Sequence, residues 1–255
     1  MKIATWNVNS IRARHELVLD WLKRVEPDVL CMQETKVVDD DFPTDELMRL
    51  GYAVAMAGQK TYNGVAIASR RPMKDIAVGL HDDGPEADKR LIAATIDGLR
   101  VLSAYIPNGK SPTLPAFQGK LHWLARLRET LERGPAGEIV LCGDFNVAID
   151  DRDVYDPEAM RGQLHFHPEE HKALAHLLDL GLVDAFRLHH EEGGLYSWWD
   201  YRGGGFRKNQ GLRIDYVFVG KALAAHCRDA SMDVDARRRD KPSDHIPVVV
   251  ELDQP

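Results

Sequence analysis

The chain has 255 residues, 44% of them hydrophobic and 29% charged, and its formal net charge is −7. That length fits one large domain or two small ones with a substantial core, and the composition is ordinary for a globular protein. This mildly acidic net charge excludes a uniformly basic surface that would bind nucleic acid. The late basic segments YRGGGFRKNQGLR and DARRRDK nevertheless leave room for a cationic groove.

No apolar run is long enough to span a bilayer, and the initial segment MKIATWNVNSIRAR lacks a secretory apolar core. We therefore expect a cytoplasmic protein without membrane contact. Its three cysteines, Cys31, Cys142 and Cys227, are odd in number and widely spaced. This pattern predicts reduced thiols, not a disulfide framework or a zinc site.

In the first half of the chain, apolar runs alternate with amphipathic stretches. Ser10 can cap a helix over 11–25 that Pro27 ends. Strands are predicted over 2–8, 28–34, 64–69, 90–96 and 100–106, the last two joined by a DGL turn.

A helical stripe of apolar residues follows over 116–133 and ends at Gly134. The second half repeats the alternation, with predicted strands over 138–142, 212–219 and 246–252 and a helix over 168–180. No linker and no repeat divides the chain, so we expect one α/β domain over residues 1–255. Periodicity alone leaves parallel and antiparallel pairing open.

Polar side chains stand where several of these strands meet loops. The run EIVLCGDFN ends in Asp144 and Asn146, which would share one face if the chain stayed extended. Other strand ends supply the polar side chains of Asn7, Glu34, Tyr105, Asp215, and Asp244 with His245. Functional sites of α/β folds gather at such ends, and hard oxygen ligands favour Mg²⁺ or Mn²⁺ over zinc.

Each of these residues also has a purely structural interpretation. Asp-Phe-Asn after a strand is often only a turn. Glu34 and Asp244 could cap loops, Asp215 could form an ion pair with Arg213, and His245 could be a packed core histidine. The histidines at 165, 167, 171 and 176 are more typical of a loop and helix start than of a metal site.

Taken together, the motifs resemble the exonuclease III family of AP endonucleases, within the endonuclease/exonuclease/phosphatase superfamily. The resemblance is carried by WNVNSIRAR, QETKV, GQKTYNGVAI, YIPNG, GDFNVA, SWWDYRGGGF, GLRIDY and KPSDHIPV, in family order from residue 1 to about 250. It implies a four-layered α/β sandwich of two stacked mixed sheets flanked by helices.

The resemblance also implies an activity: Mg²⁺-dependent hydrolysis of phosphodiesters in double-stranded DNA, at abasic sites and at blocked 3′ ends. Glu34 would bind the metal with Asn7 and Asp244 nearby, and Asn9 would order that side. Asp144 would act as the base or as a metal ligand. Asn146 would hold the water or the phosphate, and His245, oriented by Asp215, would contact a phosphoryl oxygen; both are also candidate metal residues. Tyr105 would donate to the phosphate or the leaving oxygen, with Asn108 nearby. A carboxylate base, an imidazolium and neutral donors suit this reaction, which builds negative charge on phosphate oxygens.

The segment SWWDYRGGGF suggests the substrate side. By the same resemblance, Trp198 would form the wall of a pocket for an extruded base-free sugar, with Phe206 and Trp199 sharing in it. Arg90 and Arg202 are candidate contacts to the DNA backbone.

One departure from the family concerns His165, where several relatives carry a small residue. If His165 lines the pocket, internal abasic sites could be excluded while 3′ ends still enter, giving mainly a 3′-phosphatase or 3′→5′ exonuclease. A superfamily phosphoesterase acting on other substrates and a catalytically silent DNA-binding module are further alternatives. No heptad or exposed apolar strip suggests an oligomer, so we expect a monomer.

Overall fold

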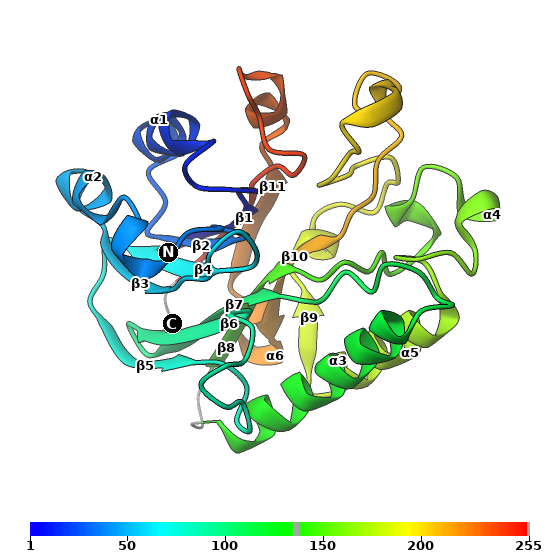
Figure 1. Cartoon of the computed structure of the whole chain (residues 1–255), viewed down its shortest axis with the longest axis horizontal. Coiled ribbons are helices and arrows are strands. Elements are labelled where there is room, and N and C mark those ends of the chain that lie inside the picture. Colours follow the sequence, from blue (N-terminus) through cyan, green and yellow to red (C-terminus); the bar gives the residue numbers. More distant parts are fainter. Residues whose placement is uncertain (135–137, 254–255) are drawn as a thin grey trace.

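Two mixed six-stranded β-sheets lie face to face, and helices cover the outer face of each sheet (Figure 1). This computed structural model describes residues 1–134 and 138–253. The predicted α/β sandwich of four layers is confirmed. None of the described helices has the length and apolarity that a membrane crossing requires.

The strand order explains how distant segments meet. The first sheet runs β11 (Cys227–Met232), β12 (Val248–Leu252), β1 (Lys2–Asn7), β2 (Val29–Gln33), β4 (Val65–Ser69) and β3 (Ala53–Ala57). The second runs β5 (Met73–Val78), β6 (Leu91–Ile96), β7 (Leu99–Tyr105), β8 (Glu138–Asp144), β10 (Asp215–Gly220) and β9 (Leu182–Asp184).

One parallel pair lies inside each sheet: β1 with β2, and β7 with β8. Strands β10 and β12 run antiparallel to β8 and β1, so each starts where its neighbour ends. The carboxyl ends of four strands and the amino ends of two therefore meet at one edge of the sandwich.

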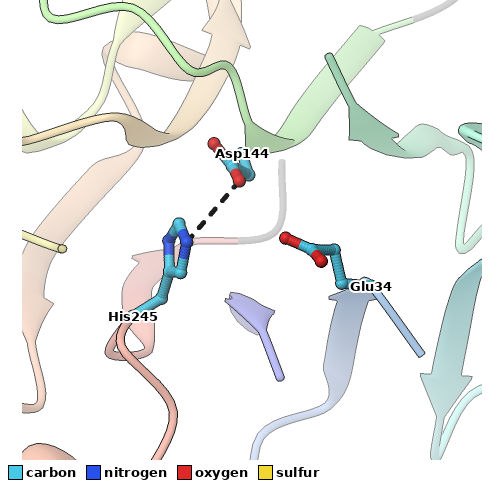
Figure 2. A group of neighbouring side chains, drawn as sticks. All are labelled: Glu34, Asp144 and His245. Carbon is cyan, nitrogen blue, oxygen red and sulfur yellow. Dashed lines mark ion pairs between the residues drawn. The ribbon is translucent and has the colours of Figure 1, made fainter. Parts of the chain in front are cut away.

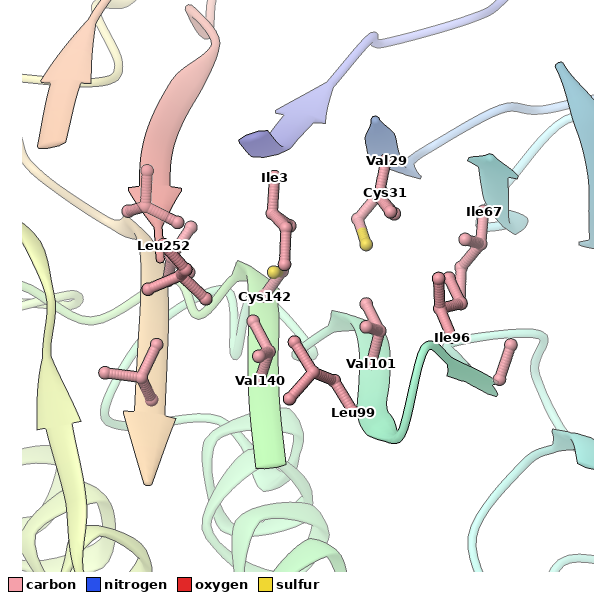
Figure 3. Packing of buried hydrophobic residues seen from close by; sticks show 14 of the residues in the cluster. Ile3, Val29, Cys31, Ile67, Ile96, Leu99, Val101, Val140, Cys142 and Leu252 are labelled. Carbon is pink, nitrogen blue, oxygen red and sulfur yellow. The ribbon is translucent and has the colours of Figure 1, made fainter. Parts of the chain in front are cut away.

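Burial on both faces explains the apolar runs of the central strands. Ile3, Cys31 and Val101 pack in the cluster between the sheets with Cys142 and Val217 (Figure 3 shows part of it). All five residues of β2 are buried, as a run apolar on both faces predicts. Cys31, Cys142 and the half-buried Cys227 are free thiols, as expected.

The helices cover the outer faces through separate clusters. Against the first sheet lie α1 (His15–Val25) and α2 (Thr44–Arg49), and against the second lie α3 (Pro115–Arg133) and α5 (Pro168–Leu178). Short helices occupy Pro157–Met160 (α4) and Lys221–Ala224 (α6), with 3₁₀ turns at Asp39–Asp41, Asp151–Asp153, Phe186–Leu188, Arg202–Gly204 and Val234–Arg238.

The predicted first helix begins too early. Ser10 has a φ of +85° and its Oγ accepts from Ala13 N at 3.4 Å, closing a turn ahead of α1 rather than capping it. The helix starts at His15 and buries Val18, Trp21 and Leu22, the spacing of one helical face.

Helix α3 matches its predicted range within one residue, but its buried stripe contains a charge. Lys120 is fully buried, whereas Leu121 beside it is only half-buried. A prediction based on apolar spacing alone places Leu121, not Lys120, on the inner face of this helix.

Sequence patterning missed four strands: β3, β5, β9 and β11. All four lie at sheet edges. Strands β5, β9 and β11 are short or largely exposed, β5 along most of its length, so they lack the continuous apolar signal of central strands. Strand β3 is rich in alanine.

Candidate active site

Strand ends deliver the predicted polar residues to the shared edge of the two sheets. Asn7 ends β1, Glu34 directly follows β2, and Asp144 ends β8. Asp215 begins β10 opposite Asp144 in register, and His245 stands just ahead of β12. Figure 2 shows Glu34, Asp144 and His245 pointing toward one another from these elements.

Asn7 joins the two carboxylates. Its Nδ2 donates to Glu34 Oε1 at 2.8 Å and to Asp144 Oδ2 at 2.9 Å, and the side chain is fully buried. One amide group therefore fixes the spacing of two like-charged groups from different sheets.

Glu34 remains ionised despite its position. Burial opposes ionisation, but Lys36 and Asn7 outweigh it and hold the pKa of Glu34 below its ordinary value. Lys36 Nζ lies 2.7 Å from Glu34 Oε2 and 2.5 Å from Asn9 Oδ1. Lys36 belongs to the QETK motif, in which nothing in the sequence alone marks the lysine for a role in the site.

Burial dominates the titration of Asp144, a residue only 1% exposed. Burial raises the pKa of Asp144 to about 7. The charge of Asp215 also raises this pKa, whereas the charge of His245 lowers it. A pKa near neutrality is the value at which a general base works best in cells.

His245 is held from both sides. Its Nδ1 donates to Asp215 Oδ2 at 2.8 Å, and its Nε2 lies 3.7 Å from Asp144 Oδ2. Burial alone would lower the pKa of His245, but Asp215 and Asp144 outweigh it and raise the pKa to about 10. As an imidazolium the ring donates from both nitrogens, whereas a metal in place of the Nε2 proton would find a ligand atom there.

Asp215 is not simply an ion-pair partner of Arg213. Arg213 instead binds Asp153 and Asp184, both at 2.7 Å. Asp215 Oδ2 accepts from Ser197 Oγ at 2.6 Å as well as from His245. Ser197, unnoticed in the sequence because a lone serine carries no pattern, thereby orients Asp215.

The prediction that Asp144 and Asn146 share a face because the chain stays extended is wrong; a turn brings the two residues together. Strand β8 ends at Asp144, and Asn146 has a φ of +54°. Asn146 N donates to Asp144 Oδ1 at 2.9 Å, a turn closed by the aspartate itself.

A second group surrounds Asn146. Asn108 Nδ2 donates to Asn146 Oδ1 at 3.1 Å, and His165 Nδ1 lies 2.5 Å from Asn146 O. Because a carbonyl only accepts, Nδ1 carries the proton. Burial and the charge of Lys120 lower the pKa of His165 to about 3, so its ring is neutral, and the ring centre lies 6.3 Å from that of Trp198.

Asp244 lies beside these groups in a different set of contacts. Its carboxylate accepts from Asn9 Nδ2 at 2.9 Å and from Trp198 Nε1 at 3.1 Å. Burial raises its pKa, but His245, Asn9 and Trp198 bring the pKa below its ordinary value. Asp244 therefore ties the Trp198 wall to the Asn9 side of the site.

Tyr105 ends β7 and is in register with Asp144. Burial and the charges of Glu34 and Asp144 raise its pKa, so the phenol stays protonated and able to donate. The Arg90 guanidinium stacks 4.8 Å above the Tyr105 ring and binds Asp88, which places Arg90 at the rim of the site.

Two predicted substrate residues lie outside this cluster. The Arg202 side chain is 91% exposed and binds Asp200, two residues away, at 2.9 Å. Phe206 packs edge-on against Trp199, with ring centres 5.0 Å apart, in a cluster with Tyr196 and Ile246. The structure does not bring Phe206 to Trp198.

The donor set of the central cluster fits a divalent cation. Glu34, Asp144 and His245 each offer one ligand atom, and these atoms lie within 4.8 Å of one another. That separation is close to the span of one Mg²⁺ coordination sphere, about 4 Å, and two of the three donors are carboxylates. The site is thus a possible metal site.

Comparisons with known proteins agree with this geometry. The Endonuclease/Exonuclease/phosphatase family matches residues 4–245. Exodeoxyribonuclease III of Haemophilus influenzae is 36% identical over 99% of this chain and 100% of its own length. The solved structure of the 3′ phosphatase NExo from Neisseria, bound to a product DNA hairpin, has 43% identity and a TM-score of 0.97 over the whole of both chains. An AP endonuclease structure from Archaeoglobus fulgidus has 41% identity and a TM-score of 0.95, again over both whole chains.

Proposed function

Because the chain belongs to the exonuclease III branch of the Endonuclease/Exonuclease/phosphatase family, we propose that it is a DNA-repair nuclease acting on abasic sites and 3′ ends. One observation carries the proposal: Glu34, Asp144 and His245, far apart in sequence, converge at the edge of both sheets. Asn7 and Asp215 hold them there from opposite sides. We further propose that the chain acts as a monomer.

Glu34 is the proposed metal ligand, with Asn7, Asp144, Asn146, Asp244 and His245 around it. Mg²⁺, or Mn²⁺ in its place, would neutralise charge on the phosphate oxygens when bound. We propose these ions because carboxylate oxygens are their preferred ligands.

The proposed chemistry of the side chains follows from their environments. Asp144, with a pKa of about 7, would accept a proton from the attacking water. His245 would donate from Nε2 to a phosphoryl oxygen, since Nδ1 is engaged by Asp215. Tyr105 would donate to the phosphate or the leaving oxygen, and Asn146 with Asn108 would hold the phosphate.

On the substrate side, we propose that double-stranded DNA lies across the edge with Trp198 as one wall of the sugar pocket. Asn9 orders this wall through Asp244. Arg90 at the rim and Arg202 on the exposed loop would contact the DNA backbone. Phe206 would act at most through Trp199, on which it packs.

A second candidate function is a 3′-end enzyme with little activity on internal abasic sites. His165 favours it, because its ring stands between the Asn146 carbonyl and Trp198, where an extruded sugar would enter. His165 has a φ of +71°, so His165→Gly suits the backbone while opening this space. A gain of internal abasic cleavage in His165→Gly, with 3′-phosphate removal unchanged, would support this restriction.

Three labelled duplexes test the proposal: one with an internal abasic site, one with a 3′-phosphate and one with a blunt 3′-hydroxyl. We expect Mg²⁺-dependent cleavage of at least the first two and none with EDTA. Activity confined to the 3′ ends would select the second candidate. No cleavage of any duplex would favour a silent binding module, and turnover of only inositol or lipid phosphates would place the enzyme elsewhere in the superfamily.

A further inference from the structure

A lysine lies buried beneath the phosphate side of the proposed site. Lys120 projects from α3 with no exposed surface, and it forms an ion pair with Glu170 of α5, which is also fully buried. Its Nζ donates to the backbone carbonyl of Asn146 at 2.6 Å and to that of Asn108 at 3.3 Å. The three donors of the ammonium thus have three acceptors.

Simple packing does not account for this arrangement. Burying a charged pair costs free energy that apolar side chains of similar volume avoid, and the neighbouring stripe positions Leu124 and Leu127 are leucines. What a leucine lacks at position 120 is the ability to bind two carbonyls at once. The specific contribution of Lys120 is therefore its contact with the two loops.

Those carbonyls belong to the two asparagines proposed to hold the phosphate. Asn146 is in the left-handed region, and its Nδ2 donates to Ile106 O at 3.0 Å while its Oδ1 accepts from Asn108. His165 Nδ1 donates to the same Asn146 carbonyl as Lys120. Glu170 uses its other oxygen to accept from His167 N at 3.1 Å, so the ion pair also restrains the His165 loop.

We propose that Lys120, with Glu170 as its counter-ion, is a positioning residue for phosphodiester cleavage. It fixes the backbone at Asn108 and Asn146, and thereby the amide groups that face the phosphate, without touching substrate. This inference rests on the proposed function of the site. It assigns an active-site role to a helix that otherwise only covers the second sheet.

The test compares Lys120→Met with Leu127→Ala on the same helix. Leu127 is fully buried and contacts neither loop carbonyl through a hydrogen bond, so its truncation should lower the melting temperature alone. We expect Lys120→Met to lower kcat on the 3′-phosphate duplex by about 10²-fold with little change in KM, because small misplacements of positioning groups cost that much. Leu127→Ala should keep kcat near the wild-type value below its melting temperature.

A double variant keeps the test decisive if Lys120→Met does not fold. Lys120→Met with Glu170→Leu removes both buried charges, a replacement that proteins often tolerate. It should show the same loss of kcat. Wild-type kcat in either folded variant, or an equal loss in Leu127→Ala, would overturn the proposal.

A second readout separates this inference from the proposed function. The side-chain amide resonances of Asn108 and Asn146 should shift or broaden in Lys120→Met and stay in place in Leu127→Ala. If the wild-type chain cleaves no duplex but these resonances shift, the positioning role stands and the proposed function fails. Unchanged resonances in folded Lys120→Met would refute the positioning role whatever the activity.

Discussion

The strand-end cluster and the loop that follows Trp198 differ in how their side chains are held. Asn7, Asp144 and Asp215 are at most 1% exposed, and each forms a side-chain hydrogen bond to a residue from another element. Arg202 in the loop is largely exposed and binds a carboxylate two residues away. In the proposed roles, the groups that meet reacting atoms are preorganised on rigid strands, whereas Arg202, the proposed contact to the DNA backbone, lies on adaptable surface.

This difference predicts two kinds of mutational effect. Substitutions in the strand-end cluster should lower kcat, because they remove groups fixed toward the reaction. Substitutions in the loop should mainly raise KM, because they remove binding interactions that are the same before and during reaction.

Asp144→Asn should have the largest effect. Loss of the proposed base should reduce the single-turnover rate on the 3′-phosphate duplex by about 10²- to 10⁴-fold, the range of general-base contributions. Asp45→Asn, at an exposed position of α2, is the matched control and should retain the full rate. A wild-type rate in Asp144→Asn would break the assignment of the base.

Asp215→Asn should follow, since it acts through His245. Losing this carboxylate should lower kcat by about 10- to 100-fold, as loss of an orienting partner generally does. It should also lower the pKa of His245 from about 10, because Asp215 is the main cause that raises it. An NMR titration of the imidazole measures this shift directly, and an unchanged pKa would contradict the pairing.

Trp198→Ala tests the boundary between the two regions. The indole is both the proposed wall and a donor to Asp244, so kcat/KM for abasic DNA should fall roughly tenfold, as expected for lost apolar pocket contact. Trp198→Phe keeps an aromatic wall and removes only the hydrogen bond. If Trp198→Phe is as impaired as Trp198→Ala, the hydrogen bond to Asp244 matters more than the wall.

Arg202→Ala should have the smallest effect. We expect KM to rise about threefold, kcat to stay unchanged, and the slope of log affinity against log salt to decrease by about one, as for one lost phosphate contact. Binding measured between low and moderate salt gives the slope. A large loss of kcat would show that the loop is more tightly coupled to the reaction than its exposure indicates.

The strand-end residues could be predicted because two signals coincide at them. An apolar run identifies the strand, and the first polar side chain after it marks the edge, as at Glu34 and Asp144. The resemblance to the family then implied two stacked mixed sheets, although it did not specify which strands pair. The resulting sandwich is correct in its layers, and the chain's buried strands were found where expected.

Other features had no such signal. Lys120 and Leu121 are adjacent on α3, and only tertiary contacts decide which one turns inward. The position of Phe206 depends on a loop in which Gly203 and Gly204 have φ values of +68° and +70°. Such turns redirect the chain without any periodic pattern, so the sequence does not show that Phe206 packs on Trp199 rather than on Trp198.

The place of β12 has a consequence for biosynthesis. This strand inserts between β11 and β1, pairing Val250 with Ile3, and His245 lies just before it. A nascent chain still short of β12 leaves β1 with β2 as its one neighbour, and His245 then has no strand to hold it at the shared edge. The site should therefore assemble only once β12 has emerged and joined the sheet.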